Sequence, residues 1–132
     1  MDYKLLIEQA FAARKNAYSP YSSFNVGAAL LSADGKIYTG CNIESASYSP
    51  TCCAERVAFF KAVSEGQRNF EAIAIVGASV SAKEFGFCSP CGVCRQVMSE
   101  FCTDDFKIIL ADSKGEQKIL TLAELLPLNF KL

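Results

Sequence analysis

The sequence contains no histidine. This absence excludes Ser-His-Asp and Cys-His catalysis, and it excludes zinc sites that use imidazole. The sequence also has no cluster of Lys or Arg, and its 13 basic and 14 acidic residues give a formal net charge of −1. A nucleic-acid-binding protein usually carries a basic face, because phosphate contacts supply most of its affinity. We therefore expect a small-molecule ligand and no nucleic-acid partner.

No stretch has the apolar character of a signal peptide, and no run is long enough to cross a bilayer. We therefore expect a cytoplasmic protein without a membrane partner, in a compartment that keeps thiols reduced. Its seven cysteines then indicate metal binding or buried small side chains instead of disulfides. The length of 132 residues suits a single domain, residues 1–132.

Hydrophobic periodicity and turn residues predict a helix, a β-hairpin and two strand–helix–strand crossovers. The expected helices are residues 3–17, 53–65, 90–101 and 122–126, and the expected strands are 26–32, 37–41, 72–76, 107–111 and 117–120. Right-handed crossovers pack their helices on a central sheet, so the fold class is α/β. Ligands bind such sheets beyond the carboxyl ends of parallel strands, and both cysteine motifs described next begin helices at such ends.

The residues Cys53-Ala54-Glu55, followed by Pro90-Cys91-Gly92-Val93-Cys94, carry the chemistry of the sequence. Three thiolates can hold a zinc ion and leave its fourth tetrahedral position open to water. Cys91 and Cys94 share one face at the start of a helix, and Cys53 begins another helix. A carboxylate beside the water, here Glu55, can move protons to and from a substrate. The pattern predicts a hydrolytic zinc enzyme.

Two of these residues also have plain structural interpretations. Glu55 could be an acidic residue that stabilises the first turn of its helix. Arg56 could be a surface cation, or it could hydrogen-bond a thiolate and offset the −1 charge of a zinc ion with three thiolates. The spacing of Glu55 from Cys53 favours the catalytic role, whereas the sequence leaves both roles of Arg56 open.

The chain resembles the small, homotetrameric, zinc-dependent cytidine deaminases that act on free nucleosides. In the general signature of zinc deaminases, H-x-E…P-C-x-x-C, Cys53 takes the place of the histidine. The resemblance extends over nearly the whole chain and includes these segments: Tyr18-Ser19-Pro20-Tyr21-Ser22, Phe24, Val26-Gly27-Ala28-Ala29, Gly40-Cys41-Asn42-Ile43-Glu44, Ser89-Pro90-Cys91-Gly92, Cys94-Arg95-Gln96, Leu125-Leu126-Pro127 and Phe130.

The resemblance implies a three-layer α/β/α fold around a mixed sheet of about five strands. It implies hydrolytic deamination of cytidine and deoxycytidine to uridine and deoxyuridine with release of ammonia, as in pyrimidine salvage. It also implies one Zn²⁺ per subunit and a homotetramer with shared active sites. The residue roles that it implies are zinc ligation by Cys53, Cys91 and Cys94, proton transfer by Glu55, a thiolate contact by Arg56, and substrate binding by Phe24, Asn42, Glu44, Tyr48, Ala54 and Phe130.

Cys88 departs from the family motif and keeps a second hypothesis open. A set of Cys53, Cys88, Cys91 and Cys94 would fill all four zinc positions and make a structural site in a non-catalytic interaction module. Pro90 argues against this set because it breaks helical continuity between Cys88 and Cys91. A third hypothesis is a related deaminase with another substrate, either a nucleoside antibiotic such as blasticidin or cytosine in a polynucleotide.

Overall fold

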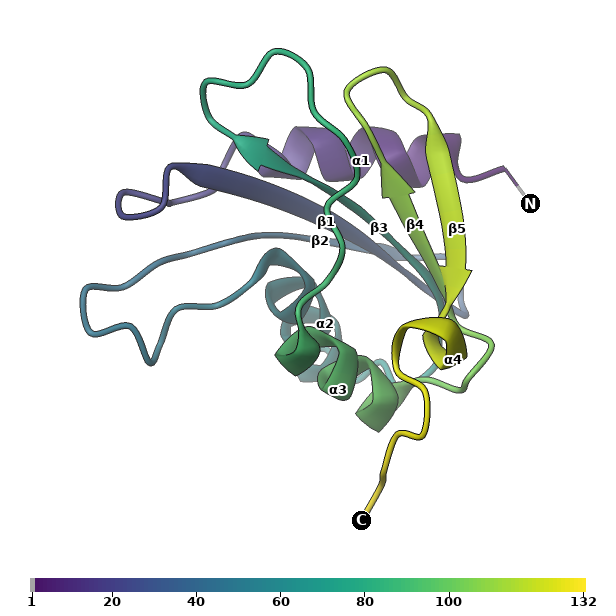
Figure 1. The fold of residues 1–132 in the computed structure, drawn as a ribbon. Helices are drawn as coiled ribbons and strands as arrows, with labels where there is room; N and C mark the ends of the chain where they lie inside the picture. Colours follow the sequence, from purple (N-terminus) through teal and green to yellow (C-terminus); the bar gives the residue numbers. More distant parts are fainter. Residues whose placement is uncertain (1) are drawn as a thin grey trace.

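The computed structural model describes residues 2–132, so Met1 of the expected domain lies outside the described residues. A five-stranded mixed sheet is covered by helices on both faces (Figure 1), which confirms the predicted three-layer α/β/α fold. The elements are, in chain order, α1 (Lys4–Arg14), β1 (Phe24–Ser32), β2 (Ile37–Cys41), α2 (Ala54–Ser64), β3 (Phe70–Ser79), α3 (Gly92–Phe101), β4 (Lys107–Ala111), β5 (Gln117–Thr121) and α4 (Leu122–Leu125).

The strands lie in the order β2-β1-β3-β4-β5. β3 and β4 are parallel, and the other neighbouring pairs are antiparallel. Because β2 and β3 both run antiparallel to β1, they point in the same direction, and the β2–α2–β3 connection crosses over β1. The carboxyl ends of β2 and β3 therefore lie at the same edge of the sheet. The segments that lead into α2 and α3 start from this edge.

Each face of the sheet has its own apolar core. On one face, α1 buries Leu6, Ile7 and Ala10 against small and branched residues of β1, β3 and β4. On the other face, α2, α3 and α4 cover the sheet (Figure 1), and Phe59 of α2 is fully buried. The Phe59 ring meets the Phe70 ring edge-on, with the centroids 5.2 Å apart. Such aromatic pairs stabilise a core beyond the area that they bury, and here they anchor α2.

Two glycines let the helices approach the sheet closely. A Cβ atom on Gly27 would lie 2.1 Å from the carbonyl oxygen of Ala10 in α1. A Cβ atom on Gly40 of β2 would lie 2.3 Å from the carbonyl oxygen of Ala54 at the start of α2. Only glycine fits at such separations. The close approach at Gly40 places the first turn of α2 directly on the sheet.

Several predicted boundaries differ from the observed ones. The first helix ends at Arg14 instead of residue 17. The predicted helices at residues 53 and 90 begin later, at Ala54 and Gly92, because Cys53 and Cys91 have extended backbones (ψ 154° and 169°) and occupy the N-cap positions. Both cysteines therefore stand just outside the first turn of a helix.

Among residues 2–132, no helix combines the length and apolar character that a membrane-spanning segment requires.

Candidate active site

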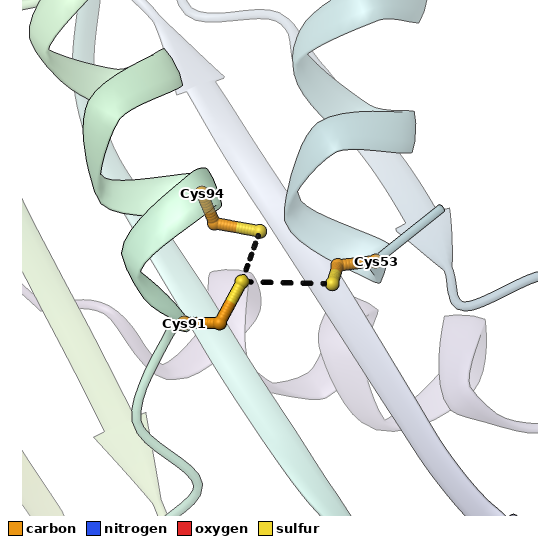
Figure 2. A group of neighbouring side chains, drawn as sticks. All are labelled: Cys53, Cys91 and Cys94. Carbon is orange, nitrogen blue, oxygen red and sulfur yellow. Dashed lines mark hydrogen bonds between the residues drawn. The ribbon is translucent and has the colours of Figure 1, made fainter. Parts of the chain in front are cut away.

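Three sulfur atoms from two helix starts meet at the edge of the sheet where β2 and β3 end. Figure 2 shows the side chains of Cys53, Cys91 and Cys94 pointing toward one another. The Sγ atom of Cys91 lies 3.8 Å from that of Cys53 and 3.5 Å from that of Cys94, and all three lie within 4.8 Å of one another. Neither N-cap cysteine uses its side chain to cap its own helix. Their sulfurs face each other instead.

The sulfur separations fit a zinc ion. Zn–S bonds of about 2.3 Å in tetrahedral geometry place two sulfurs about 3.8 Å apart. Within the described residues 2–132, the group that could hold a metal contains Cys53, Cys91 and Cys94, and no fourth Cys, Asp or Glu joins it. A zinc ion on these three sulfurs would therefore keep one coordination position for a non-protein ligand, as catalytic zinc sites do.

Arg56 lies beside the sulfur cluster. Its Nη2 atom donates to the Sγ of Cys53 at 3.4 Å. Contacts with Cys94 and Arg56 lower the pKa of the Cys53 thiol to about 5, although burial opposes them. The hydrogen bond between Cys94 and Cys53, together with burial, raises the pKa of the Cys94 thiol. Of the two roles that the sequence left open for Arg56, the geometry favours the thiolate contact.

Glu55 is the buried carboxylate of the site, with 4% of its surface exposed. It belongs to the first turn of α2, two residues after Cys53. Burial, followed by the charge of Cys53, raises the pKa of Glu55 to about 7. A carboxylate that merely stabilised a helix start would lie in solvent, where its charge is well hydrated. Its burial favours the catalytic interpretation.

A cavity of about 290 Å³ opens onto the sulfurs. Seven of the residues that the sequence singled out line it together: Phe24, Asn42, Glu44, Cys53, Ala54, Glu55 and Cys91. Cys94 is buried behind this wall, and Arg56 is not among the lining residues. The volume is close to the lower end of the range for small-ligand sites.

Asn42 and Glu44 organise one end of this cavity. The Asn42 side chain accepts from Val26 N at 2.8 Å and donates to Phe24 O at 2.7 Å. Glu44 accepts from the backbone N–H groups of Tyr21 and Ser22, and the Ser22 hydroxyl lowers its pKa. These contacts hold both side chains at the cavity and leave each with unused acceptor positions.

Tyr48 and Phe130 lie outside this cavity. Tyr48 is 76% exposed and lines a neighbouring cavity, which shares Ser22, Glu44 and Thr51 with the first. Phe130 is 65% exposed, and its carbonyl oxygen accepts from the Gln96 side chain at 3.2 Å. In the described residues of a single chain, Tyr48 therefore lies next to the candidate active site, whereas Phe130 lines neither of the two cavities.

Cys88 lines the cavity but does not join the sulfur cluster. Its Sγ atom packs on β3, where a Cβ atom on Gly77 would lie 2.7 Å from it. Burial raises the pKa of Cys88 to about 11. Because its sulfur packs on β3 and lies outside the group of three sulfurs that could hold a metal, the arrangement disfavours the closed four-cysteine site.

Several residues that line the cavity had no predicted role. Ser22, Thr51 and Ser89 contribute hydroxyl groups, and Val26 contributes an apolar wall. The three hydroxyl residues lie in loops, which carry no periodic signal, whereas Val26 begins the predicted strand 26–32. For Ser22, the available signal was its place in a loop that the family resemblance included, two residues before Phe24.

Comparison with known proteins gives one consistent family. A family model described as the cytidine and deoxycytidylate deaminase zinc-binding region matches residues 1–110. A cytidine deaminase of Sporosarcina psychrophila is 54% identical over 127 residues, which cover 96% of this chain and 90% of the relative. A cytidine deaminase of Halalkalibacterium halodurans is 50% identical, with 96% and 92% covered. The crystal structure of cytidine deaminase from Burkholderia pseudomallei is similar with a TM-score of 0.90 and 45% identity, and covers 98% of this chain and 100% of its own.

Proposed function

This chain belongs to the cytidine and deoxycytidylate deaminase family, and we propose that it converts both cytidine and deoxycytidine to their uracil nucleosides and ammonia. Zinc dependence and deamination of cytidine follow from the family and from the three-sulfur cluster. The activity on the deoxynucleoside, the products and a place in pyrimidine salvage are the proposed part, with residues 1–132 acting as one catalytic domain. One observation carries it: a cluster of three sulfurs, two of them in the cavity wall, lies beside a buried carboxylate that lines the same cavity.

Cys53, Cys91 and Cys94 would hold the zinc ion. When bound, zinc supplies Lewis acidity that lowers the pKa of a coordinated water to about 7. Arg56 offsets the negative charge that three thiolates bring to the ion, through its contact with the Cys53 sulfur. The cavity walls around the sulfurs are predominantly apolar. Glu55 follows the zinc ligand Cys53 by two residues, closer in sequence to a zinc ligand than any other carboxylate.

Glu55 moves the protons of the reaction. It accepts a proton from the attacking water and donates it to N3 of the cytosine ring, while the water oxygen adds to C4. Glu55 then takes the proton of the new C4 hydroxyl group and passes it to the 4-amino group; the C4–N bond breaks, ammonia leaves and the C4 carbonyl group forms. The buried position of Glu55 keeps bulk water from competing for these protons.

Asn42, Glu44 and Phe24 bind the substrate. The unused acceptor positions of Asn42 and Glu44 suit the hydroxyl groups of a pentose. Phe24, half exposed at 39%, offers an aromatic surface to the pyrimidine ring, and the Ala54 backbone lies at the wall beside Glu55. Either cytidine or deoxycytidine satisfies this arrangement, because both retain the 3′-hydroxyl group.

The charges around the cavity favour a free nucleoside over a nucleotide or a polynucleotide. Among residues 2–132, no Lys or Arg lines this cavity or its neighbour at Tyr48, whereas Glu44 lines both. A 5′-phosphate would therefore meet a carboxylate without a compensating cation.

We also propose the homotetramer. Tyr48 and Phe130 are exposed aromatic residues that a single chain leaves at the surface, and a neighbouring subunit would bring such side chains to the cavity. Sedimentation of the purified protein tests this part, and a monomer would contradict it.

The function is tested with a substrate panel at equal concentrations, with zinc content measured on the same sample. We expect release of ammonia from cytidine and deoxycytidine. Turnover should be at least about 100-fold lower for cytidine 5′-monophosphate and for cytosine in single-stranded DNA, whose phosphates meet Glu44 without a cation from the described residues, and for blasticidin, which would leave polar groups of the site unpaired. Zinc-loaded protein that forms no uridine from cytidine would contradict the proposal.

A further inference from the structure

Arg95 bridges the segment that carries Cys91 to the end of the chain's last helix. It follows Cys94 in α3, and the residue is half-buried. Its Nε atom donates to Pro90 O at 2.8 Å, its Nη2 atom donates to Ser89 Oγ at 2.9 Å, and its Nη1 atom donates to Leu125 O at 2.7 Å. One side chain thus joins three segments.

The segment before Cys91 has little else to hold it. Residues 86–90 contain no helix or strand. In the described part of the chain, the two hydrogen bonds that this segment makes are those from Arg95 to Pro90 and Ser89. Its other anchors are apolar, namely the buried Pro90 ring and the packing of Cys88 on Gly77. The orientation of the segment depends on Arg95.

The hydrogen bond to Pro90 acts directly on Cys91. The carbonyl group of Pro90 and the amide nitrogen of Cys91 belong to one planar peptide unit. A hydrogen bond that fixes the Pro90 oxygen therefore fixes the direction in which the Cys91 backbone starts. Cys91 is an N-cap residue with an extended backbone, so the turns of α3 do not by themselves fix its side chain. Cys94, in contrast, lies inside the first turn of α3 and is held by the helix.

We propose that Arg95 is a positioning residue of the zinc site. It holds the Cys91 sulfur at the distance from the Cys94 and Cys53 sulfurs that a shared zinc ion requires, and the Leu125 carbonyl group of α4 orients the Arg95 side chain. The inference rests on the ligand set proposed above. Arg95 differs from Arg56, which contacts a sulfur directly, because each of its three hydrogen bonds ends on an oxygen. The role of Arg95 is therefore to fix geometry, so a lysine, which keeps the positive charge but not the three hydrogen bonds, should not replace it.

The test compares zinc release from Arg95→Ala, Arg95→Lys and wild-type protein after mixing with an excess of a chromogenic chelator. Arg68→Ala is the matched control, since Arg68 also donates to two carbonyl oxygens, of Val63 and Gln67, at the far end of α2. We expect both Arg95 variants to lose zinc about 10–100-fold faster than wild type, the usual effect of removing a residue that orients a ligand. Arg68→Ala should release zinc at the wild-type rate even where its melting temperature falls.

A second measurement separates ligand geometry from general stability. In cobalt-substituted protein, the sulfur-to-cobalt charge-transfer absorption reports the number and arrangement of thiolate ligands. We expect this absorption to weaken or shift in both Arg95 variants and to stay unchanged in Arg68→Ala. If Arg95→Ala does not fold, Ser89→Ala, which removes one of the three acceptors, should still accelerate zinc release by a smaller factor.

Three outcomes overturn the inference. In the first, Arg95→Ala folds and has the zinc-release rate and cobalt spectrum of the wild type. In the second, Arg95→Lys has the wild-type zinc-release rate and cobalt spectrum. In the third, Arg68→Ala accelerates zinc release as much as the Arg95 variants do. Failure of the ligand set itself gives a different result. In that case, wild-type protein would contain no zinc, or Cys91→Ser would keep it.

Discussion

Arg56 donates a hydrogen bond to the sulfur of Cys53 at 3.4 Å. Cys53 is the N-cap of α2, and Arg56, three residues later, lies on the same face of the helix. The contact raises the pKa of Arg56, so the guanidinium remains charged beside the thiolate. Three thiolates around a divalent ion leave a net charge of −1, which weakens the ion as a Lewis acid. The contact places a compensating positive charge at the site.

Arg56→Gln should therefore lower both turnover and zinc retention. Loss of a residue that hydrogen-bonds a ligand usually costs about 10–100-fold in metal affinity or activity. The measurements are kcat for cytidine and zinc content per chain after dialysis against a chelator. Arg68→Gln, which changes an exposed arginine at the other end of α2, is the control. Unchanged kcat and zinc content in Arg56→Gln would refute the role of this contact.

Glu55→Gln should abolish turnover while the zinc site remains loaded. General acid–base catalysis contributes about 10²–10⁴-fold, and an amide cannot take up the proton of the water. Ammonia release from cytidine and metal content are measured on the same sample. The matched control is Glu65→Gln, at the exposed end of the same helix. A non-catalytic zinc module predicts the opposite result for Glu55→Gln, namely no loss of function.

Cys88→Ser should retain zinc. The Cys88 thiol lies outside the sulfur cluster and packs on β3 instead. Serine keeps nearly the same volume, so the packing on Gly77 survives the change. Zinc content after purification is compared with that of Cys91→Ser, which we expect to lose the ion. Release of zinc from Cys88→Ser would instead support the closed four-cysteine site.

Gly40→Ala should destabilise the protein and displace the first turn of α2. The new Cβ atom would lie 2.3 Å from the Ala54 carbonyl oxygen and 2.6 Å from the Ala58 nitrogen, both backbone atoms. Overpacking of this kind costs about 1–3 kcal/mol of unfolding free energy, measured by chemical denaturation. Gly86→Ala, where a Cβ atom meets nothing within 4 Å, is the control. Equal stability of Gly40→Ala and wild type would show that α2 can move without cost.

Much of the architecture followed from local patterns. The predicted helix over residues 90–101 and the predicted strand over residues 72–76 each correspond to an element of the structure, α3 and β3. The ends of elements were harder to predict. β3 extends from Phe70 to Ser79 because its ends pair with Ser32 and Phe24 of β1. These paired residues are 38 and 55 positions apart in the sequence, separations to which local periodicity is insensitive.

The amino-acid sequence by itself determined which chemistry is possible in this protein. Without histidine, only thiolates and carboxylates remain as metal ligands, and the C-x-E and C-x-x-C spacings select Cys53, Glu55, Cys91 and Cys94. Each spacing covers no more than four residues, about one turn of a helix, so it can be recognised without knowing the rest of the fold.

Only the tertiary structure decided which of these groups act together. Cys53 and Cys91 are 38 positions apart, and their sulfurs meet because two crossovers bring the starts of α2 and α3 to one edge of the sheet. The same packing buried Glu55, turned Cys88 toward β3 and set Arg95 between Pro90 and α4. Distance and burial between remote segments depend on how the whole chain packs, and no local pattern contains that information.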